Sequence, residues 1–327
     1  MKRLLILLIL LAYSINAQVE TSSGVQPGNV LPFYIDTADY LSVDSSKSRL
    51  DVFIQVPYSS IQFLKRGNLF NASYNITLTF YGSDKEKILF EKMWKERLSA
   101  DQFEQTISRY NSNISYRSFD LEPGTYLIKC NVEDADSRKS STKEINVELK
   151  AINASLGISG PILVSEIIKS SEGEKIYPNV SKIVTNKQDS LKIYHEVYSS
   201  NQEQIFIEYY IENLKSNVTT KQLLPTEIQP GTNQINYTFK NINFQLGDYI
   251  LKIILKNNNW EEIASSEKGF HSKIYGLPNI IMDLDKAIEQ MIYIASPGEL
   301  SHIRNGDSYE ERLNRFLGFW NNKRPNT

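Results

Sequence analysis

The residues that could support acid–base or metal chemistry are few and scattered along the chain. His195 precedes Glu196, but Val, Tyr and Ser follow, so the second histidine of a zinc-protease motif is missing. The other histidines, His271 and His302, have no acidic or cysteine companions at metal-ligand spacing. We therefore interpret His195 as a packed strand residue. The sequence predicts no catalytic residue, no cofactor and no metal site.

Two pairs of aspartates have a spacing that suggests calcium. Asp134 and Asp136 follow the end of an expected strand, and Asp283 and Asp285 lie on the polar face of an expected helix. Neither pair has the glycine and terminal glutamate of an EF-hand loop, so a solvated turn is the simpler interpretation of the first pair. The sequence also lacks a nucleophile elbow, a phosphate-binding loop and a dinucleotide fingerprint.

The single cysteine is predicted to be structural. Cys130 alternates with Tyr126, Ile128 and Val132, which indicates one buried face of a strand. A catalytic thiol needs a nearby histidine, and none is close in sequence. One cysteine also excludes a disulfide framework and a cysteine-based zinc site.

Aromatic side chains are the one possible binding feature. The candidates for exposed rings at strand ends or in loops are Tyr58, Tyr110, Tyr116, Tyr198 and Trp260. Such rings stack on sugars or anchor a protein partner. The alternative is ordinary packing inside a β-sandwich.

Composition narrows the class of protein. The chain has 327 residues, with 36 Lys and Arg against 38 Asp and Glu, a net charge of −2. This balance argues against a nucleic-acid groove or a polybasic membrane patch, so no nucleic-acid partner is expected. The 19 Tyr and 14 Phe, against only 15 Gly, favour strands over glycine-rich cofactor loops.

The first residues have the pattern of an export signal. Lys2 and Arg3 precede the apolar run 4–12, and Ala17 ends a short polar stretch suited to cleavage. We therefore expect a signal peptide over 1–17. No later stretch is long enough to cross a bilayer, so the mature chain is expected to have no transmembrane segment. The expected location is the periplasm, the outer membrane or the exterior.

The rest of the chain predicts a mostly β protein with two tandem antiparallel Ig-like β-sandwich modules and a short helical C-terminal segment. The modules are expected over 18–150 and 151–275, and the helical segment over 276–327. Period-two alternation carries this prediction in the runs 50–56, 74–80, 145–149, 191–197, 205–211, 235–239 and 249–255. Residues 85–110 fit either a helix with an apolar stripe or two strands. Two strands are favoured because the segments on both sides are themselves expected to be strands.

The strand pattern occurs twice in the same order. Leu121–Tyr126 and Leu246–Tyr249 each contain a leucine, a glycine turn and a tyrosine that opens a strand, and the run 50–56 resembles 191–197. This order predicts two sandwiches of similar topology. The alternative is that all β proteins share such short patterns.

The helical segment has clear start signals. Ser296 to Glu299 forms a capping box with proline at the first helical position, and Asp307 to Glu310 repeats the signal. Ile281, Leu284, Ile288, Met291 and Ile292 are expected on one face of the first helix. The last helix carries an apolar stripe of Tyr309, Leu313, Phe316, Leu317 and Trp320. We expect this stripe to lack full cover, and either to dock loosely within the chain or to bind another envelope protein or a second copy.

Several sequence segments together resemble the GWxTD domain-containing proteins, exported proteins found mainly in Bacteroidetes-like bacteria. The segments are 56–65, 121–126, 293–300 and 315–325, and the region 293–325 is the most specific. The Gly-Trp-x-Thr-Asp signature itself is absent, so the resemblance implies only the β modules and a truncated start of the named domain, over 276–327. It implies no activity and transfers no site residue.

Together these patterns predict an exported envelope protein that is a non-catalytic binding or structural β-sandwich module, and not an enzyme. The alternative is an enzyme acting on polysaccharide, or its accessory carbohydrate-binding subunit. That alternative requires two facing carboxylates in a cleft at glycosidase spacing.

Overall fold

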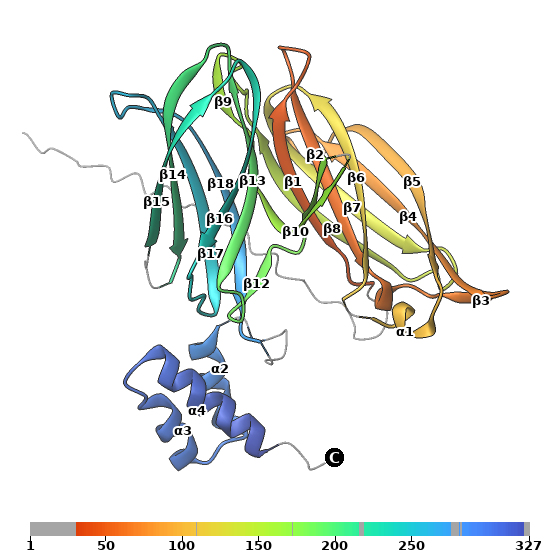
Figure 1. Ribbon diagram of the computed structural model, residues 1–327. Helices are drawn as coiled ribbons and strands as arrows, with labels where there is room; N and C mark the ends of the chain where they lie inside the picture. The colour runs from red at the N-terminus through yellow and green to blue at the C-terminus, as the bar shows by residue number, and fades with distance from the viewer. Residues whose placement is uncertain are drawn as a thin grey trace, which may run out of the picture.

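The computed structural model describes residues 31–108, 110–171, 173–215, 219–275, 281 and 283–323. The expected signal peptide over 1–17 lies outside these residues. The described chain forms two β-sandwiches side by side and a small helical unit beyond the second (Figure 1). The predicted fold class is confirmed.

The first sandwich has two antiparallel sheets. One sheet has the order β1-β2-β6, and in the other β4 lies between β5 and β7, with β8 beyond β7 and a short β3 beside the start of β4. The strands are β1 (Tyr34–Leu41), β2 (Ser48–Pro57), β3 (Leu64–Arg66), β4 (Leu69–Tyr81), β5 (Ile88–Ala100), β6 (Ser112–Leu121), β7 (Gly124–Asp134) and β8 (Ser140–Leu149).

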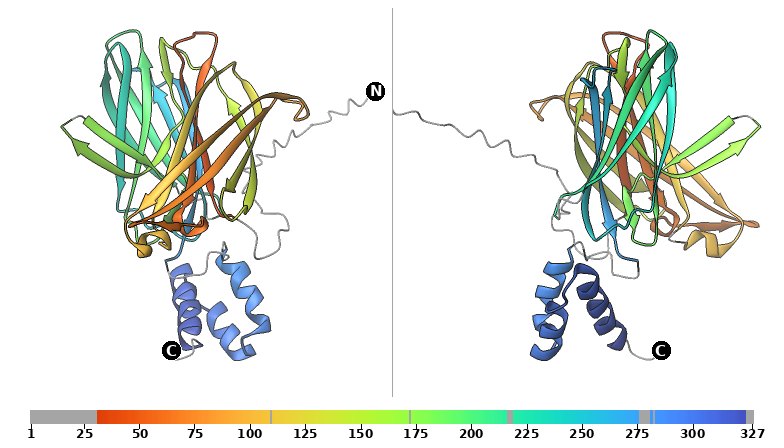
Figure 2. Two further views of the ribbon diagram at one scale, coloured as in Figure 1. Left: turned by 90° about the vertical axis from the view of Figure 1, so that its right-hand side faces the viewer. Right: turned by 60° about the vertical axis from the view of Figure 1, so that its left-hand side comes forward.

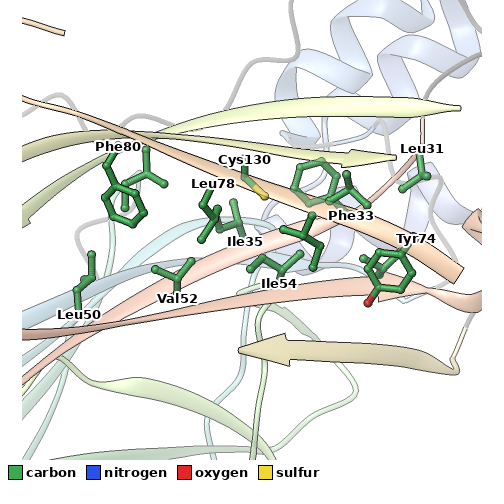
Figure 3. Close-up of a cluster of buried hydrophobic side chains, with 14 of the residues drawn as sticks. Leu31, Phe33, Ile35, Leu50, Val52, Ile54, Tyr74, Leu78, Phe80 and Cys130 are labelled. Atoms are coloured by element: carbon green, nitrogen blue, oxygen red, sulfur yellow. The ribbon is translucent and has the colours of Figure 1, made fainter. Parts of the chain in front are cut away.

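The core of this sandwich follows the predicted alternation. Leu50, Val52, Ile54 and Val56 are all buried between the two sheets. Figure 3 shows Cys130 in this core, and its predicted burial is confirmed.

The second sandwich repeats the arrangement. Its sheets have the orders β11-β10-β13-β16 and β12-β18-β17-β14-β15, and β9 pairs with β13. The strands are β9 (Leu156–Ile158), β10 (Ile162–Ser170), β11 (Gly173–Pro178), β12 (Ile183–Thr185), β13 (Ser190–Ser199), β14 (Glu203–Asn213), β15 (Thr219–Ile228), β16 (Gly231–Lys240), β17 (Gly247–Lys256) and β18 (Glu262–Lys273). The order β10-β13-β16 matches β1-β2-β6, and β15-β14-β17-β18 matches β5-β4-β7-β8. The prediction of two sandwiches with similar topology is therefore confirmed.

The two repeated segments that end in a tyrosine form the same local structure. The Tyr126 hydroxyl donates to the carbonyl of Glu122 at 2.6 Å, and the Tyr249 hydroxyl donates to the carbonyl of Gln245 at 3.2 Å. Each tyrosine therefore reaches back four residues and fixes the turn that enters β7 or β17. This is the tyrosine corner of Ig-like sandwiches.

The segment 85–110 is mainly strand. Residues 88–100 form β5, and only Phe103–Thr106 form a single helical turn, α1. The favoured interpretation as strands is thus correct for β5. A second short turn, the 3-10 helix η1 (Tyr58–Ser60), follows β2.

The two sandwiches meet through the outer faces of β1-β2-β6 and β10-β13. Ala38, Tyr40, Ile162, Val164 and Tyr194 form a small buried cluster at this contact. Ion pairs and backbone hydrogen bonds surround the cluster and fix how the sandwiches sit.

Two polar contacts hold the sandwiches especially close. The Lys268 ammonium donates to the carboxylate of Asp36 at 2.9 Å and to the carbonyl of Thr37 at 2.6 Å. The Gly160 amide donates to the carbonyl of Asp39 at 2.8 Å. A β-carbon on Gly160 would lie 2.3 Å from the Asp39 carboxylate oxygen, so only glycine fits this approach.

The helical unit contains α2 (Leu284–Gln290), the 3-10 helix η2 (Met291–Tyr293), α3 (Pro297–Arg304) and α4 (Tyr309–Asn322). It lies below the second sandwich in both views of Figure 2. The predicted capping box at Ser296 and Glu299 is present. The last helix begins one residue later than the expected start signal, with Ser308 as its cap. Ile292 is 62% exposed, contrary to its expected place on the buried face, because the 3-10 turn η2 breaks the helical period there.

The described residues include no helix that is both long and apolar enough to span a membrane.

Candidate binding cleft between the sandwiches

A cleft of about 620 Å³ lies where the first sandwich meets the β10–β11 hairpin of the second. Its floor is the outer face of β2 and β6, at Gln55, Ser112 and Ile114. One wall is η1, the end of β5 and the residues around α1. The other wall is the base of the hairpin, at Ser165 and Glu166, with residues 177–179 beyond it. Both sandwiches therefore contribute to one site.

Hydrogen bonds hold the first wall in place. The Tyr58 amide donates to the carbonyl of Asn111 at 2.9 Å, which ties η1 to the start of β6. The Asn111 amide donates to the Ser108 hydroxyl at 3.1 Å, and its side-chain amide donates to the carbonyl of Gln105 at 3.4 Å. On the floor, the Gln55 side-chain amide donates to the Ser112 hydroxyl at 2.9 Å.

A β-bulge shapes the opposite wall. The pairing of β10 with β11 shifts between Val164 and Glu166, so Ser165 is an extra residue. Its hydroxyl donates to the carbonyl of Tyr177 at 2.9 Å. The bulge changes the phase of the strand, so that Ile167 rather than Glu166 packs on the apolar cluster between the sandwiches. Glu166 is left exposed at the cleft.

Three tyrosines line the cleft, and they differ in exposure. Tyr110 is 91% exposed, whereas Tyr58 and Tyr177 are half-buried. The Tyr58 ring is held against Phe63 at a centroid distance of 5.3 Å. Amide and hydroxyl side chains also line the cleft. The cleft thus offers aromatic faces together with uncharged hydrogen-bonding groups.

The charged residues that the structure describes in the cleft are acidic. Asp101 comes from the first sandwich and Glu166 from the second, and no lysine or arginine is among the described lining residues. Both carboxylates belong to exposed residues. The cleft therefore presents one exposed carboxylate from each sandwich beside its amide, hydroxyl and tyrosine side chains.

The buried carboxylates elsewhere have structural partners. Asp36 pairs with Lys268, and Asp51 lies 3.2 Å from the Arg49 guanidinium. The carboxylate of Asp134 accepts from the amides of Gln62 and Asp136, so this residue caps its turn from within. The predicted turn is present, but Asp134 is 1% exposed and not solvated.

Glu208 is the most strongly paired acid. Lys221 and Lys256 lie 3.0 and 2.9 Å from its carboxylate, and the Tyr210 hydroxyl donates to it at 2.8 Å. Burial alone would raise the pKa of Glu208, but the hydrogen bonds from Lys256, Tyr210 and Lys221 outweigh it and lower the pKa to about 2.

Two of the histidines have a side-chain partner within the second sandwich. His195 is fully buried in the second core, and its Nε2 lies 3.0 Å from the Tyr209 hydroxyl. Burial lowers the pKa of His195 to about 3, so it is neutral and packed as predicted. Nδ1 of His271 lies 2.8 Å from the Asp248 carboxylate. Among the described residues, no cluster of His, Cys, Asp and Glu could hold a metal ion.

The structure separates the aromatic candidates into three groups. Tyr58 and Tyr110 line the cleft, and Tyr116 and Trp260 are exposed elsewhere. Tyr198 was expected to be exposed, but it is 2% exposed. It lies between the sandwiches, where its hydroxyl donates to Glu196 at 2.6 Å. Tyr177 was not among the predicted residues, although the turn residues Pro178 and Asn179 mark it as a strand-end aromatic.

The apolar stripe of the last helix is largely covered by its own chain. Leu313 and Phe316 are buried, Tyr309 and Leu317 are half-buried, and Trp320 is 37% exposed. The cover comes from α2 and α3 and from residues of the second sandwich such as Leu246 and Ile274. Phe319, which the sequence analysis missed, is buried beside them. The Tyr309 hydroxyl also accepts the Leu246 amide at 2.8 Å.

Comparisons with known proteins identify no family for this chain. No protein-family model and no curated protein matches the chain. Among solved structures, red sea bream transglutaminase is 9% identical over 73% of this chain and 31% of its own, with a TM-score of 0.22. A Bacteroides uniformis β-glucuronidase is 9% identical over 75% of this chain and 32% of its own, with a TM-score of 0.26. The chain spans about a third of the length of these structures, and likeness at this level carries no argument about function.

Proposed function

We propose that this chain is an exported bacterial envelope protein of the GWxTD type, and that it is a non-catalytic binding module. Its ligand site is the cleft between the sandwiches. The observation that carries the proposal is the lining of this cleft by Tyr58, Tyr110 and Tyr177 with interleaved amide and hydroxyl groups. Pockets of a few hundred cubic ångströms with a few convergent polar groups are typical small-ligand sites.

The ligand class that fits best is a neutral segment of polysaccharide. Tyrosine faces stack on the C–H face of a pyranose ring, and the Gln55, Gln105 and Asn111 amides offer donors and acceptors to its hydroxyls. The carboxylates of Asp101 and Glu166 disfavour an anionic polymer. A site shared by two sandwiches also suits an extended chain that lies across both.

The test is calorimetric titration of the mature protein with cellohexaose, maltohexaose and mannohexaose. Tyr110→Ala should weaken binding about tenfold, the loss expected from one stacking ring. Tyr293→Ala is the matched control, because Tyr293 is 87% exposed but lies on the helical unit. No binding to any of the three, or equal loss in both variants, would defeat the proposal.

The alternative of a polysaccharide-acting enzyme rests on Asp101 and Glu166, which come from opposite walls of the cleft. It predicts release of reducing ends from the bound oligosaccharide, abolished in both Asp101→Asn and Glu166→Gln. Binding without turnover supports the binding module. N-terminal sequencing of the exported protein should find Gln18 first, and recovery of intact Met1 would exclude export with cleavage.

The helical unit is proposed as a second contact surface, for another envelope protein or a second copy of this chain. What supports it is the exposed Trp320 beside the buried Phe316 and Phe319. Light scattering after size exclusion compares the mature chain with one ending at Gly276. A monomer in both cases would remove this part of the proposal.

A further inference from the structure

A second exposed aromatic site lies far from the cleft, in the turn between β17 and β18. The indole ring of Trp260 stacks on the ring of Phe206, with centroids 4.7 Å apart and planes inclined by 16°. Trp260 is nonetheless 52% exposed. One face of the indole therefore covers Phe206, and the other face is open to solvent.

The backbone of Trp260 is in an unfavourable conformation for this residue. Its φ angle is +66°, in the left-handed region where glycine and asparagine are usual and a bulky side chain is strained. The turn is closed by other groups. The Trp260 amide donates to the carbonyl of Asn257 at 3.0 Å, and the Asn257 side-chain oxygen accepts the amides of Asn259 and Glu261. Glycine would satisfy the same turn without strain, so the turn itself does not require a tryptophan.

The surroundings of the ring are polar. Asn258, Asn259, Glu261 and Glu262 are exposed around the turn. The nearby cation, Lys256, is held by the carboxylate of Glu208 at 2.9 Å. A stable protein interface needs about 800 Å² from each partner with an apolar centre. One open ring bordered by amides and carboxylates is too small for that, but it matches a single sugar ring.

We propose that Trp260 is a platform that binds one neutral hexopyranose ring of a polysaccharide. The C–H face of the sugar stacks on the open face of the indole, and its hydroxyls bond to the exposed Asn and Glu side chains of the turn. The platform lies at the end of the second sandwich opposite the helical unit (Figure 1). The ligand class is shared with the proposed function of the cleft, but the residues are not. Two such sites on one chain would let it hold a polymer at two points.

The experiment is a fluorescence titration of the mature protein with cellohexaose, maltohexaose and mannohexaose. The chain has three tryptophans, Trp94, Trp260 and Trp320, so each signal is assigned with variants. At least one of the oligosaccharides should change the emission of the unmodified protein. Trp260→Gly should abolish the change and weaken affinity at this site about tenfold, whereas Trp260→Tyr should retain binding.

Thermal melting separates a binding role from a structural one. Because glycine relieves the strained φ angle, Trp260→Gly should leave the melting temperature unchanged or raise it. Trp320→Ala is the control for loss of an exposed tryptophan elsewhere, and it should leave the titration intact. A clear fall in the melting temperature of Trp260→Gly together with an unchanged titration would show that the ring only packs on Phe206, and would overturn the proposal.

The experiments test the proposed cleft and the proposed platform independently. If Tyr110→Ala abolishes calorimetric binding while Trp260→Gly has no effect, the cleft binds sugar and the platform does not. The reverse result keeps the platform and rejects the cleft. An unmodified protein whose emission responds to none of the three oligosaccharides overturns the platform.

Discussion

The two sandwiches share one topology but present different outer faces to solvent. The two sandwiches can be aligned on their corner tyrosines. Five residues beyond the corner tyrosine, Asn131 pairs with Thr77 in the first sandwich and Ile254 pairs with Glu208 in the second, so Thr77 and Glu208 occupy matched positions. The matching outward positions are Asn75, Thr77 and Thr79 on β4, and Phe206, Glu208 and Tyr210 on β14. On the first face Asn75 and Thr77 are half-buried, and Thr79 is 8% exposed and donates to the Glu91 carboxylate at 2.9 Å. The second holds two aromatic rings and an acid that is 2% exposed.

This difference distinguishes the residues that the shared topology requires from those that it does not require. Both sandwiches bury the same alternate positions and use the same tyrosine corner, so those residues build the fold. An outer face of threonine and asparagine is enough for the first sandwich. The second sandwich has the aromatic rings and the ion cluster on β14 in addition, and one of these rings, Phe206, stacks on Trp260. Substitutions at matched positions test the comparison.

The largest expected effect comes from the cores, at matched positions of β7 and β17. Cys130 and Ile253 are both fully buried, each four residues beyond the corner tyrosine. Ile253→Asp buries an unpaired charge and should cost about 4 kcal/mol or more of unfolding free energy. Cys130→Ala removes one sulfur atom and should cost about 1 kcal/mol. Urea denaturation measures both, and a cost below about 1 kcal/mol for Ile253→Asp would mean that this position is not part of a closed core.

The next effect concerns how the two sandwiches are joined. Gly160→Val places a side chain where the Asp39 carboxylate and amide now lie, at 2.3 and 3.0 Å from the β-carbon. It should cost about 1–3 kcal/mol, separate the sandwiches and open the cleft. Small-angle scattering should report a larger radius of gyration and calorimetry a loss of oligosaccharide binding. Gly124→Ala is the control, because its β-carbon would meet nothing closer than 3.9 Å.

The ion cluster on β14 predicts a pH effect confined to the second sandwich. The pKa of Glu208 is lowered to about 2 in the folded protein, and an unfolded glutamate titrates near 4.3. The contribution of Glu208 to the free energy of unfolding is therefore complete above about pH 4.3 and is lost as the pH falls toward 2. Glu208→Gln should cost about 2 kcal/mol at pH 7 and much less at pH 3. Thr77→Gln at the matched position should show no such pH dependence in urea denaturation.

The sequence predicts the fold far better than the binding site. Alternation identifies buried strands because one face of each sheet is dry, and the corner tyrosines recur in order because they make the same turn. The cleft depends on contacts that no local pattern records. Tyr110 and Tyr177 belong to different sandwiches, and the bulge at Ser165 decides that Glu166 faces the cleft. Tyr198 is the opposite case. It lies on an outer strand face of the second sandwich, and the first sandwich packs against that face and buries it.

The smallest expected effect compares the two tyrosine corners. In the first corner the Tyr126 hydroxyl makes one bond, to the carbonyl of Glu122. In the second the Tyr249 hydroxyl donates to the Gln245 carbonyl and also accepts the Gln245 amide at 2.9 Å. Tyr126→Phe should therefore cost about 1 kcal/mol, the value of one hydrogen bond. Tyr249→Phe should cost somewhat more, because it leaves both backbone groups of Gln245 without this partner.

The second corner also supports the helical unit, since the residue after Gln245 is Leu246, whose amide bonds to Tyr309. Tyr249→Phe should accordingly speed amide exchange in α4, whereas Tyr126→Phe should leave α4 unchanged. Hydrogen exchange with mass spectrometry measures this difference. If both variants lose the same stability and neither affects α4, the corners are equivalent. The helical unit is then held by its other contacts with the second sandwich, which are its packing against Leu246 and Ile274 and the ion pairs of Lys215 with Asp283 and Asp285.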